Sequence, residues 1–439
     1  MNIIIAGAGK VGFNLAKRLS IGHSVTVIDK NSQALDRIQE SLDILPLRGD
    51  VEDVNTYKSF TDQEIDLFIA VTNVDNVNLV SAMMVDATLQ VKRKFVRIQK
   101  SFFQEQIIEK RLDVNKVIFP LKLTSRAVSS LLKYPKANNV KFFKYTPYKL
   151  ISIMVSGKTF PQTIDSDFFK IVGIERKKKF FIPEADADVE ILPNDLVYFF
   201  GDENEIKQIC QKLDLDNRLD IQKCVVFGGG ELGVAIAQEL IKVDREVKLV
   251  EKDLQLCEIA NEELKGKASI INYKYSSHDI FKDEGLKSAD IFVAATNNDE
   301  YNIIKCLEAK ESGITKVVAI HNEMGYYNLM HSLGIVVVRG PKMSAYNAIM
   351  EEIGSSGVVI QKSYCGAKGV VFMRKIFPSS KLINKSIKPL SLKDASVFYI
   401  RDNRMYSFHE KIILQENDLI VLFCASKSSA KAKVWIYEL

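Results

Sequence analysis

Residues 3–12 read Ile3-Ile4-Ile5-Ala6-Gly7-Ala8-Gly9-Lys10-Val11-Gly12, an apolar run followed by a G-x-G-x-x-G motif. The run is typical of a buried strand, and apolar residues then recur at every fourth position from Val11 to Leu19, as on one helix face. Here Gly7 permits a tight turn, Gly9 lets the backbone approach a pyrophosphate, and Gly12 lets helix and strand pack closely. The helix N-terminus offers free N–H groups and the positive end of a dipole. This stretch therefore predicts a Rossmann-like nucleotide-binding unit.

An acidic residue stands where the ribose of a nucleotide is expected. Asp29 closes the next predicted strand, 17 residues after Gly12. An acid there hydrogen-bonds a ribose hydroxyl and disfavours a 2′-phosphate, so NAD or an adenosine nucleotide fits better than NADP. A Rossmann-like domain that keeps its glycines for packing alone is the alternative. Strand, helix and acid in the right order favour nucleotide binding.

The motif occurs a second time. Gly228-Gly229-Gly230-Glu231-Leu232-Gly233 repeats residues 7–12 at an offset of 221, and Glu251 takes the place of Asp29. Four ordered matches at nearly one offset, about half the chain length, indicate a tandem duplication. The other three matches pair Ala70–Asp75 with Ala294–Asp299, Val117–Pro120 with Val338–Pro341, and Asn194–Val197 with Asn417–Ile420.

The pattern of secondary structure that the sequence predicts changes within each half. Over the first 139 residues, short apolar runs alternate with helical stretches, which predicts a doubly wound parallel sheet. From about residue 140, strands and turns dominate. The predicted fold class is α/β, with two tandem Rossmann-like doubly wound parallel sheets, each followed by a small strand-rich α+β domain. The predicted domains are 1–139 (first Rossmann), 140–220 (first small domain and linker), 221–356 (second Rossmann) and 357–439 (second small domain).

Composition excludes several classes of protein. The 439 residues include 60 Lys plus Arg and 55 Asp plus Glu, and a net charge of +5 is too small to indicate a nucleic-acid partner. No apolar run approaches the ~18 residues that span a bilayer, and the N-terminus lacks the basic region of a signal peptide. We therefore expect a soluble protein made in the cytoplasm.

The six cysteines form no CxxC pair, so no metal site is expected and all six read as buried apolar residues.

Further candidate residues follow later predicted strands in the two copies. Thr72-Asn73 and Thr296-Asn297 follow the fourth strand of each copy, at the edge where open α/β sheets bind ligands. Both pairs also suit helix capping. Gly49-Asp50 lies on the loop after the third strand, and Arg97 ends the fifth.

The second copy departs from the first at three of these positions. Glu231 replaces Lys10 at the helix start, where a carboxylate suits the helix dipole by about 0.3–1 kcal/mol but repels a phosphate. By sequence, Gly49-Asp50 aligns with Tyr275-Ser276, and Arg97 aligns with Ala319. These changes predict a weakened or altered second site and leave open whether it binds.

No catalytic constellation stands out. None of the five histidines lies at a repeated position, and Ser130-x-x-Lys133 has no partner motif. The one basic cluster, residues 176–179, reads as a hairpin turn. A solvated loop is the plain interpretation, and contact with an acidic partner or with lipid headgroups is the alternative.

The double set of Rossmann motifs and the repeated Asn-Asp-Leu resemble the TrkA family of Trk potassium-uptake regulatory proteins, which carry tandem KTN/RCK domains. The resemblance implies a regulatory subunit, not an enzyme, that binds NAD(H) or ATP/ADP. It also implies a homo-oligomer, a tetrameric ring, on the inner face of the plasma membrane, bound to a potassium-translocating subunit such as TrkH. The candidate nucleotide-binding residues are Gly7, Ala8, Gly9, Lys10, Val11, Gly12, Asp29, Asp50, Thr72, Asn73 and Arg97 in the first copy, and Gly228, Gly229, Gly230, Glu231, Leu232, Gly233, Glu251, Thr296 and Asn297 in the second.

Two other functions use the same fold. One is an NAD-dependent oxidoreductase with a second, fused Rossmann domain, for which NADH turnover would be diagnostic. The other is a regulator of a cation/proton antiporter. A nucleotide would regulate any partner only by binding two arrangements of the assembly with different affinity.

Overall fold

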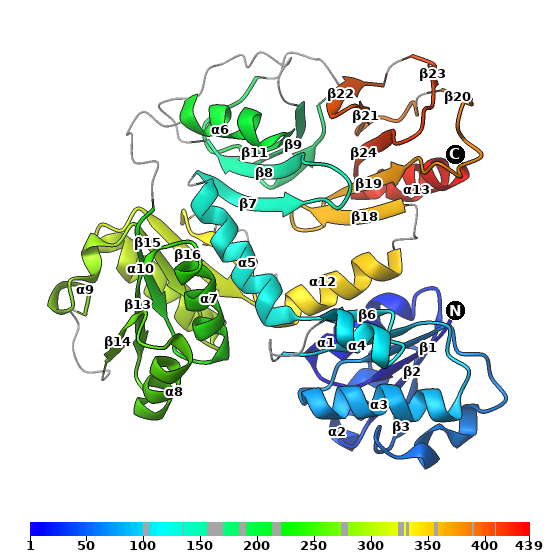
Figure 1. Ribbon diagram of the computed structural model, residues 1–439, viewed down its shortest axis with the longest axis horizontal. Coiled ribbons are helices and arrows are strands. Elements are labelled where there is room, and N and C mark those ends of the chain that lie inside the picture. The colour runs from blue at the N-terminus through cyan, green and yellow to red at the C-terminus, as the bar shows by residue number, and fades with distance from the viewer. Residues whose placement is uncertain are drawn as a thin grey trace. The chain divides into compact units, whose positions relative to one another are not determined.

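The computed structural model (Figure 1) describes most of the chain. Five of the six cysteines lie in its described part as free, buried side chains, and the side chain of Cys210 lies outside it. None of the helices in the described part has the length and apolar character that crossing a membrane requires. The described residues are 1–99, 105–134, 136–155, 170–183, 190–212, 221–273, 280–323, 329–330, 333–354, 359–388, 390–408 and 410–439.

The first Rossmann sheet is six-stranded with the order β3-β2-β1-β4-β5-β6, and its strand pairs are parallel. The order reverses between β1 and β4, which is the switch point where such sheets bind ligands. This confirms the predicted doubly wound sheet. The strands are β1 (Asn2–Ala6), β2 (Ser24–Asp29), β3 (Leu45–Arg48), β4 (Leu67–Ala70), β5 (Lys94–Arg97) and β6 (Lys116–Ile118).

Helices pack on this sheet through the apolar stripes that the sequence predicts. In α1, Val11, Leu15 and Leu19 are buried and Lys17 is exposed, so one face of the helix meets the strands and the other meets solvent. The helices are α1 (Lys10–Leu19), α2 (Ser32–Gln39), the 3₁₀-helix η1 (Val54–Phe60), α3 (Asp75–Thr88), α4 (Glu105–Arg111) and α5 (Pro120–Lys133).

The second Rossmann sheet repeats the first. Its order is β14-β13-β12-β15-β16-β17, and α7, α8 and α10 pack against it (Figure 1). The strands are β12 (Lys223–Phe227), β13 (Glu246–Glu251), β14 (Ser269–Asn272), β15 (Ile291–Ala294), β16 (Lys316–His321) and β17 (Val336–Arg339). The helices are α7 (Glu231–Ile241), α8 (Leu254–Leu264), α9 (Ile280–Asp283), the 3₁₀-helix η2 (Leu286–Ser288), α10 (Asp299–Glu311) and α12 (Pro341–Gly354).

Each Rossmann sheet is followed by a five-stranded antiparallel sheet, as predicted. The first has the order β10-β9-β11-β8-β7, and the second β18-β19-β24-β21-β22. The first comprises β7 (Ala137–Phe142), β8 (Lys149–Met154), β9 (Lys170–Arg176), β10 (Lys179–Phe181) and β11 (Leu196–Gly201), followed by α6 (Glu203–Lys212). The second comprises β18 (Val359–Tyr364), β19 (Gly369–Lys375), β21 (Ala395–Arg401), β22 (Arg404–Ser407) and β24 (Leu419–Ala425), with the pair β20 (Ser386–Ile387) and β23 (Ile412–Ile413), the 3₁₀-helix η3 (Ser426–Ser428) and α13 (Ser429–Glu438).

The two antiparallel sheets share one aromatic core. The rings of Phe200 on β11 and Phe423 on β24 lie 5.1 Å apart between centroids, and Tyr198 and Tyr364 lie 5.3 Å apart. The Tyr364 hydroxyl donates a 2.7 Å hydrogen bond to the Val172 carbonyl of β9. The two small sheets therefore pack as one body, although they are about 220 residues apart in the sequence.

The chain forms two compact units. One contains Met1–Ser125 and Arg339–Met350, and the other contains Arg126–Val338 and Glu351–Leu439. In the first, the hydroxyls of Thr124 on α5 and Ser344 on α12 lie 3.1 Å apart. The four-domain division at residues 139, 220 and 356 stays a prediction, and residues 213–220, at the end of the region predicted as first small domain and linker, lie outside the described residues.

The repeated Asn-Asp-Leu motif has a structural role in both small sheets. Asn194 and Asn417 adopt left-handed backbone conformations, with φ of 69° and 67°, which turn the chain into β11 and β24. The next residues, Asp195 and Asp418, are buried and bind an arginine guanidinium through both oxygens. The arginines are Arg176, at 2.9 and 2.7 Å, and Arg401, at 2.8 and 2.7 Å.

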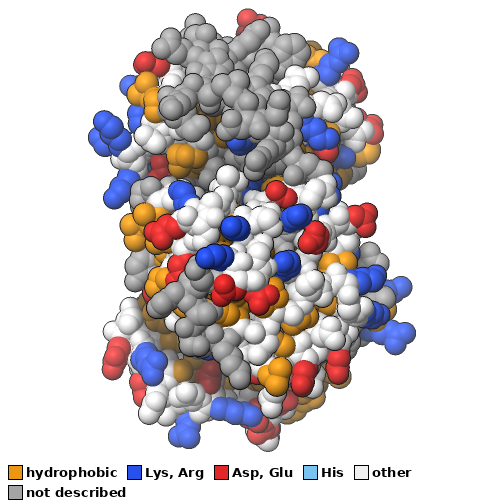
Figure 2. Space-filling model, turned by 90° about the vertical axis from the view of Figure 1, so that its left-hand side faces the viewer, with side chains coloured by type: hydrophobic (Ala, Val, Ile, Leu, Met, Phe, Trp, Pro, Cys, Tyr) orange, Lys and Arg blue, Asp and Glu red, His pale blue; other side chains and the backbone are white. Residues whose placement is uncertain are grey.

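The predicted basic hairpin is confirmed over residues 176–179. Lys177 and Lys178 form its turn between β9 and β10, with φ of 47° and 68°. Arg176 is bound to Asp195, so three exposed lysines remain at the tip. Elsewhere, Figure 2 shows a face on which Lys and Arg side chains stand among Asp and Glu.

Candidate functional site

The glycines of the first loop have two different physical roles. Gly7 has a φ of +114°, and a Cβ built on it would lie 3.0 Å from the backbone nitrogen of Thr72. A Cβ on Gly12 would lie 1.9 Å from the carbonyl oxygen of Gly7. A Cβ on Gly9 would meet no atom within 4 Å. Gly7 and Gly12 are therefore required by the fold, whereas Gly9 leaves open space beside the helix N-terminus.

The helix that follows begins without a side-chain cap. Gly9 is the N-cap of α1, and its carbonyl accepts the first helical hydrogen bond, from Phe13 N–H at 2.8 Å. Lys10 is exposed at the first helical position, while Val11 is buried against the sheet. The N-terminus of α1 thus has no side-chain cap, and the helix dipole there favours an anion.

Asp29 lies next to this loop. Its Oδ2 accepts a 2.6 Å hydrogen bond from Ala8 N–H, and its Oδ1 accepts one of 2.8 Å from Asn31 N–H. A carboxylate accepts about four hydrogen bonds, so Asp29 retains capacity for ligand hydroxyls. The half-buried side chain thus links the glycine loop to the end of β2.

Asp50 lies on the neighbouring loop. Gly49 N–H donates to the Asp29 carbonyl at 3.1 Å, which places the two acids on adjoining strand ends. The Asp50 carboxylate accepts from Glu52 N–H at 3.0 Å and pairs with Lys30 at 2.9 Å. These contacts, the backbone hydrogen bond first, lower the pKa of Asp50, which stays ionised at neutral pH.

A buried asparagine that the sequence analysis missed organises the rest of the edge. The side-chain oxygen of Asn78 accepts from Thr72 N–H at 2.8 Å and from the Thr72 hydroxyl at 2.7 Å. Its amide donates to the carbonyls of Thr72 and Arg97. Asn302 makes the equivalent bonds to Thr296 and Ile320. The repeat offset of 224 extends to this pair and could have revealed it.

Arg97 is a buried cation at the end of β5. The side chain is 4% exposed, and its Nη1 lies 3.4 Å from the Thr72 carbonyl and from Asn73 Oδ1. Within the described part of the chain, its Nε has no hydrogen-bond partner. Burial lowers the pKa of the guanidinium, and the charge of Asp75 partly opposes that shift. A buried guanidinium whose contacts in the described part of the chain are long ones to neutral oxygens suits an anionic ligand.

These contacts bring the first-copy candidates together at one edge of the sheet. Gly7 touches Thr72, Ala8 binds Asp29, and the Asp50 loop adjoins Asp29. Arg97 reaches the Thr72-Asn73 turn, and the Asn73 side chain is exposed there. The arrangement can present N–H donors and a cation to phosphates, and a carboxylate to hydroxyls.

The second copy keeps the same glycine geometry. Gly228 has a φ of +111°, a Cβ on Gly233 would lie 1.7 Å from the Gly228 carbonyl oxygen, and Gly230 meets nothing within 4 Å. Leu232 is buried and Glu231 is exposed, like Val11 and Lys10. The backbone geometry of the first glycine loop is therefore present a second time.

Glu251 differs from Asp29 in how it is held. Its Oε2 accepts from Gly229 N–H at 2.6 Å, and its Oε1 accepts from Lys252 N–H at 2.7 Å and Asp253 N–H at 3.0 Å. A Cβ on Gly229 would lie 2.7 Å from the Glu251 Cβ. The longer acid thus fits because glycine stands where the first copy has Ala8.

Strand pairing corrects the alignment of two second-copy positions. Ala70 pairs with Val96 and Ala294 pairs with Ala319, so Arg97 corresponds to Ile320, not to Ala319. Gly49 and Tyr273 each donate N–H to the carbonyl of the ribose-position acid, so Gly49 corresponds to Tyr273. The expected counterparts Tyr275 and Ser276 lie outside the described residues.

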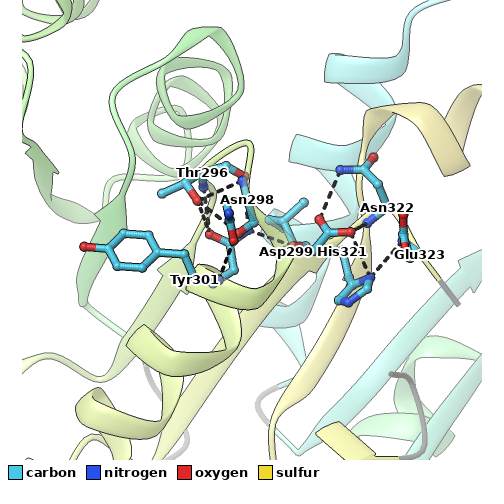
Figure 3. A network of polar contacts seen from close by, with 9 residues as sticks. Thr296, Asn298, Asp299, Tyr301, His321, Asn322 and Glu323 are labelled. Atoms are coloured by element: carbon cyan, nitrogen blue, oxygen red, sulfur yellow. Dashed lines mark hydrogen bonds and ion pairs between the residues drawn. The ribbon is translucent and has the colours of Figure 1, made fainter. Parts of the chain in front are cut away.

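Polar residues surround the turn after β15 (Figure 3). Asp299 Oδ2 accepts from Asn322 N–H at 2.9 Å and lies 3.3 Å from His321 Nδ1. His321 is buried, and the same Nδ1 accepts from Glu323 N–H at 2.8 Å. The Thr296 hydroxyl binds Asn302, and Asn297 is exposed beside it. In the first copy Asp75 accepts from Gln99 N–H at 2.8 Å, so the acid has the same backbone role.

Comparison with known proteins gives a family match. The model of the TrkA-N domain matches residues 3–120 and again residues 224–341. The Trk system potassium uptake protein TrkA of Halomonas elongata is 24% identical over 445 residues, which cover 97% of this chain and 96% of that protein. The TrkA homolog of Archaeoglobus fulgidus is 24% identical over 437 residues, which cover 96% of this chain and 97% of that protein.

Solved structures share the fold. A structure described as the GsuK channel bound to NAD has a TM-score of 0.64 at 14% identity, covering 98% of this chain and 78% of that one. The crystal structure of the GsuK RCK domain has a TM-score of 0.62 at 15% identity, covering 99% and 95%. The whole chain therefore has a known architecture.

Proposed function

The chain belongs to the TrkA-N domain family, and from that membership we propose that it is a nucleotide-binding regulatory subunit that gates a membrane potassium channel or transporter. One observation carries the nucleotide part of the proposal. Arg97 is a buried cation with an unsatisfied Nε among the described residues. It lies at the sheet edge where α1 begins without a side-chain cap. Both features favour a bound phosphate.

The residues present fit NAD(H) or ATP/ADP. Backbone N–H groups of residues 9–12 and the Arg97 guanidinium would hold the phosphates, and Asp29 would accept from ribose hydroxyls. Lys10 adds a positive charge at the helix start. The structural neighbour described as bound to NAD supports this choice of ligand.

Regulation requires a partner, because a ligand changes ion flow only by favouring one arrangement of an assembly over another. The names of the relatives support a potassium-uptake system as that partner. The proposed assembly is a tetrameric ring bound to a TrkH-like subunit on the inner face of the plasma membrane. The nucleotide is sensed and released, not consumed.

The experiment is calorimetric titration of the full chain with NADH, NAD, ADP and ATP, comparing wild type with Arg97→Ala. Loss of hydrogen bonds to a charged group, about 1.5–3 kcal/mol, corresponds to affinity weakened by about tenfold to 100-fold. Arg93→Ala is the matched control, because Arg93 lies just before β5 with its guanidinium 5.0 Å over the Phe95 ring. Unchanged affinity in Arg97→Ala would contradict the site.

Function is tested by potassium uptake in cells that depend on this chain and its membrane subunit. Arg97→Ala should uncouple uptake from nucleotide supply while the protein remains folded. Steady turnover of NADH by the purified chain would instead favour an oxidoreductase. Nucleotide-dependent cation/proton exchange without potassium uptake would favour an antiporter regulator.

A further inference from the structure

We propose that dinucleotide binding is confined to the first Rossmann copy, and that the second copy rejects phosphate-bearing ligands through its side chains at four matched positions. The inference rests on the proposed nucleotide-binding function. The four pairs, first copy before second, are Lys10 and Glu231, Asp29 and Glu251, Gly49 and Tyr273, and Arg97 and Ile320.

The second copy has kept its backbone for a reason other than phosphate binding. A Cβ on Gly233 would collide with the Gly228 carbonyl at 1.7 Å, and Gly228 itself has a left-handed φ. Asn302 holds Thr296 as Asn78 holds Thr72. Packing alone therefore requires Gly228 and Gly233, so the presence of these two glycines does not show that a ligand binds.

Charge at the phosphate position is reversed between the copies. Arg97 is the buried cation of the first site, and its counterpart Ile320 is apolar and 1% exposed. Lys10 becomes Glu231, an exposed carboxylate in the first turn of α7. A phosphate at that helix N-terminus would meet a negative charge and no buried guanidinium.

In the second copy, contacts within the protein also occupy the position expected for the ribose. Glu251 accepts three backbone N–H bonds and is 9% exposed, whereas Asp29 accepts two and is half-buried. A ligand hydroxyl would have to displace one of the amides of Gly229, Lys252 or Asp253. The side chain of Tyr273 packs on the core of this sheet where Gly49 has none.

One further acid, Glu323, lies beside the Asp299–His321 contact of the second copy. Asp299 and His321 lie 3.3 Å apart, and Glu323 follows on the same turn (Figure 3). Asp299 has its counterpart in Asp75, but His321 replaces the apolar Ile98 and no cation replaces Arg97. The local balance of charge therefore disfavours binding of a dianionic pyrophosphate.

The test is the stoichiometry of NADH binding to the full chain by calorimetry. Wild type should bind one equivalent per chain. Lys10→Glu with Arg97→Ile should abolish that binding, whereas Glu251→Ala should leave it at one equivalent. Glu231→Lys with Ile320→Arg should add a second equivalent.

Because a buried arginine at position 320 could unfold the second copy, photolabelling provides a readout on the wild-type protein. An azido-adenine analogue of NAD should label peptides from residues 1–139 and spare those from 221–356. Two equivalents of similar affinity, or equal labelling of both regions, would overturn the inference and leave the proposed function standing. The absence of any binding to folded protein would overturn both.

Discussion

Gly12 lies so close to the carbonyl oxygen of Gly7 that a Cβ on Gly12 would stand 1.9 Å from it. The contact joins the first turn of α1 to the loop that leaves β1. The same contact recurs between Gly233 and Gly228, at 1.7 Å. The spacing of the glycine motif is therefore a packing requirement before it is a binding requirement.

Gly12→Ala should destabilise the first unit strongly. The methyl group meets backbone, which cannot move without displacing α1 from the sheet, so we expect a cost of about 1–3 kcal/mol or more. Urea denaturation followed by circular dichroism measures it. Gly22→Ala is the control, since its Cβ would meet nothing within 4 Å. Equal stability of the two variants would contradict the close contact.

Gly9→Ala should separate binding from folding. Its Cβ would meet no protein atom within 4 Å, so the midpoint of thermal unfolding should stay near that of wild type. The added methyl group would occupy the space where the backbone approaches a pyrophosphate. We expect NADH affinity to fall at least about tenfold, or about 1.4 kcal/mol. If the folded variant bound NADH with wild-type affinity, the ligand would not bind at this loop.

Asn78→Ala should lower the free energy of unfolding by about 3 kcal/mol or more. The substitution leaves the Thr72 N–H and the carbonyls of Thr72 and Arg97 without their side-chain partner, at about 1–3 kcal/mol for a buried group. Asn76→Ala, on the exposed face of the same helix, is the matched control. Chemical denaturation of both variants provides the comparison, and a loss below about 0.5 kcal/mol for Asn78→Ala would refute the role of this side chain.

The pKa of Asp50 should respond only in part to the loss of its cation. The Glu52 N–H lowers this pKa most and Lys30 adds to the effect, so Lys30→Ala should raise it without restoring the ordinary value. Carboxyl-carbon NMR titration measures the shift. Because the folded pKa is depressed, ionised Asp50 stabilises the fold above its ordinary pKa. This contribution is lost as the pH falls through the folded pKa. An unchanged pKa in Lys30→Ala would exclude the ion pair.

Asp418→Asn should destabilise the second small sheet by about 3–5 kcal/mol, the cost of breaking a buried ion pair. Arg401 would lose both of its carboxylate bonds, and Gln415 N–H would lose its charged acceptor. Asp402→Asn, at the exposed hairpin turn, should have little effect. Thermal unfolding compares the two, and equal midpoints would show that the buried pair contributes nothing.

Sequence alone determined the duplication, the strand–helix alternation and the glycine loop with its acid. These are properties of local order: the glycine spacing, the period of apolar residues and the acid at Asp29 are readable because strand and helix impose fixed repeats on neighbouring residues. The sequence showed that the Asn-Asp-Leu motif is repeated, but it showed neither the turn that the motif forms nor the partner of its aspartate. Asp195 binds Arg176, and only strand pairing brings that arginine beside it.

Tertiary structure decided which side chains meet. The pairing of β15 with β16 shows that Ile320, and not Ala319, is the counterpart of Arg97. The difference matters because neighbouring residues of a strand point to opposite faces of the sheet. Burial of Asn78 and the contact of Glu251 with the Gly229 amide depend on loops that converge from different strands. The shared core of the two small sheets joins residues about 220 apart. No local pattern encodes such contacts, since they form only when distant segments pack.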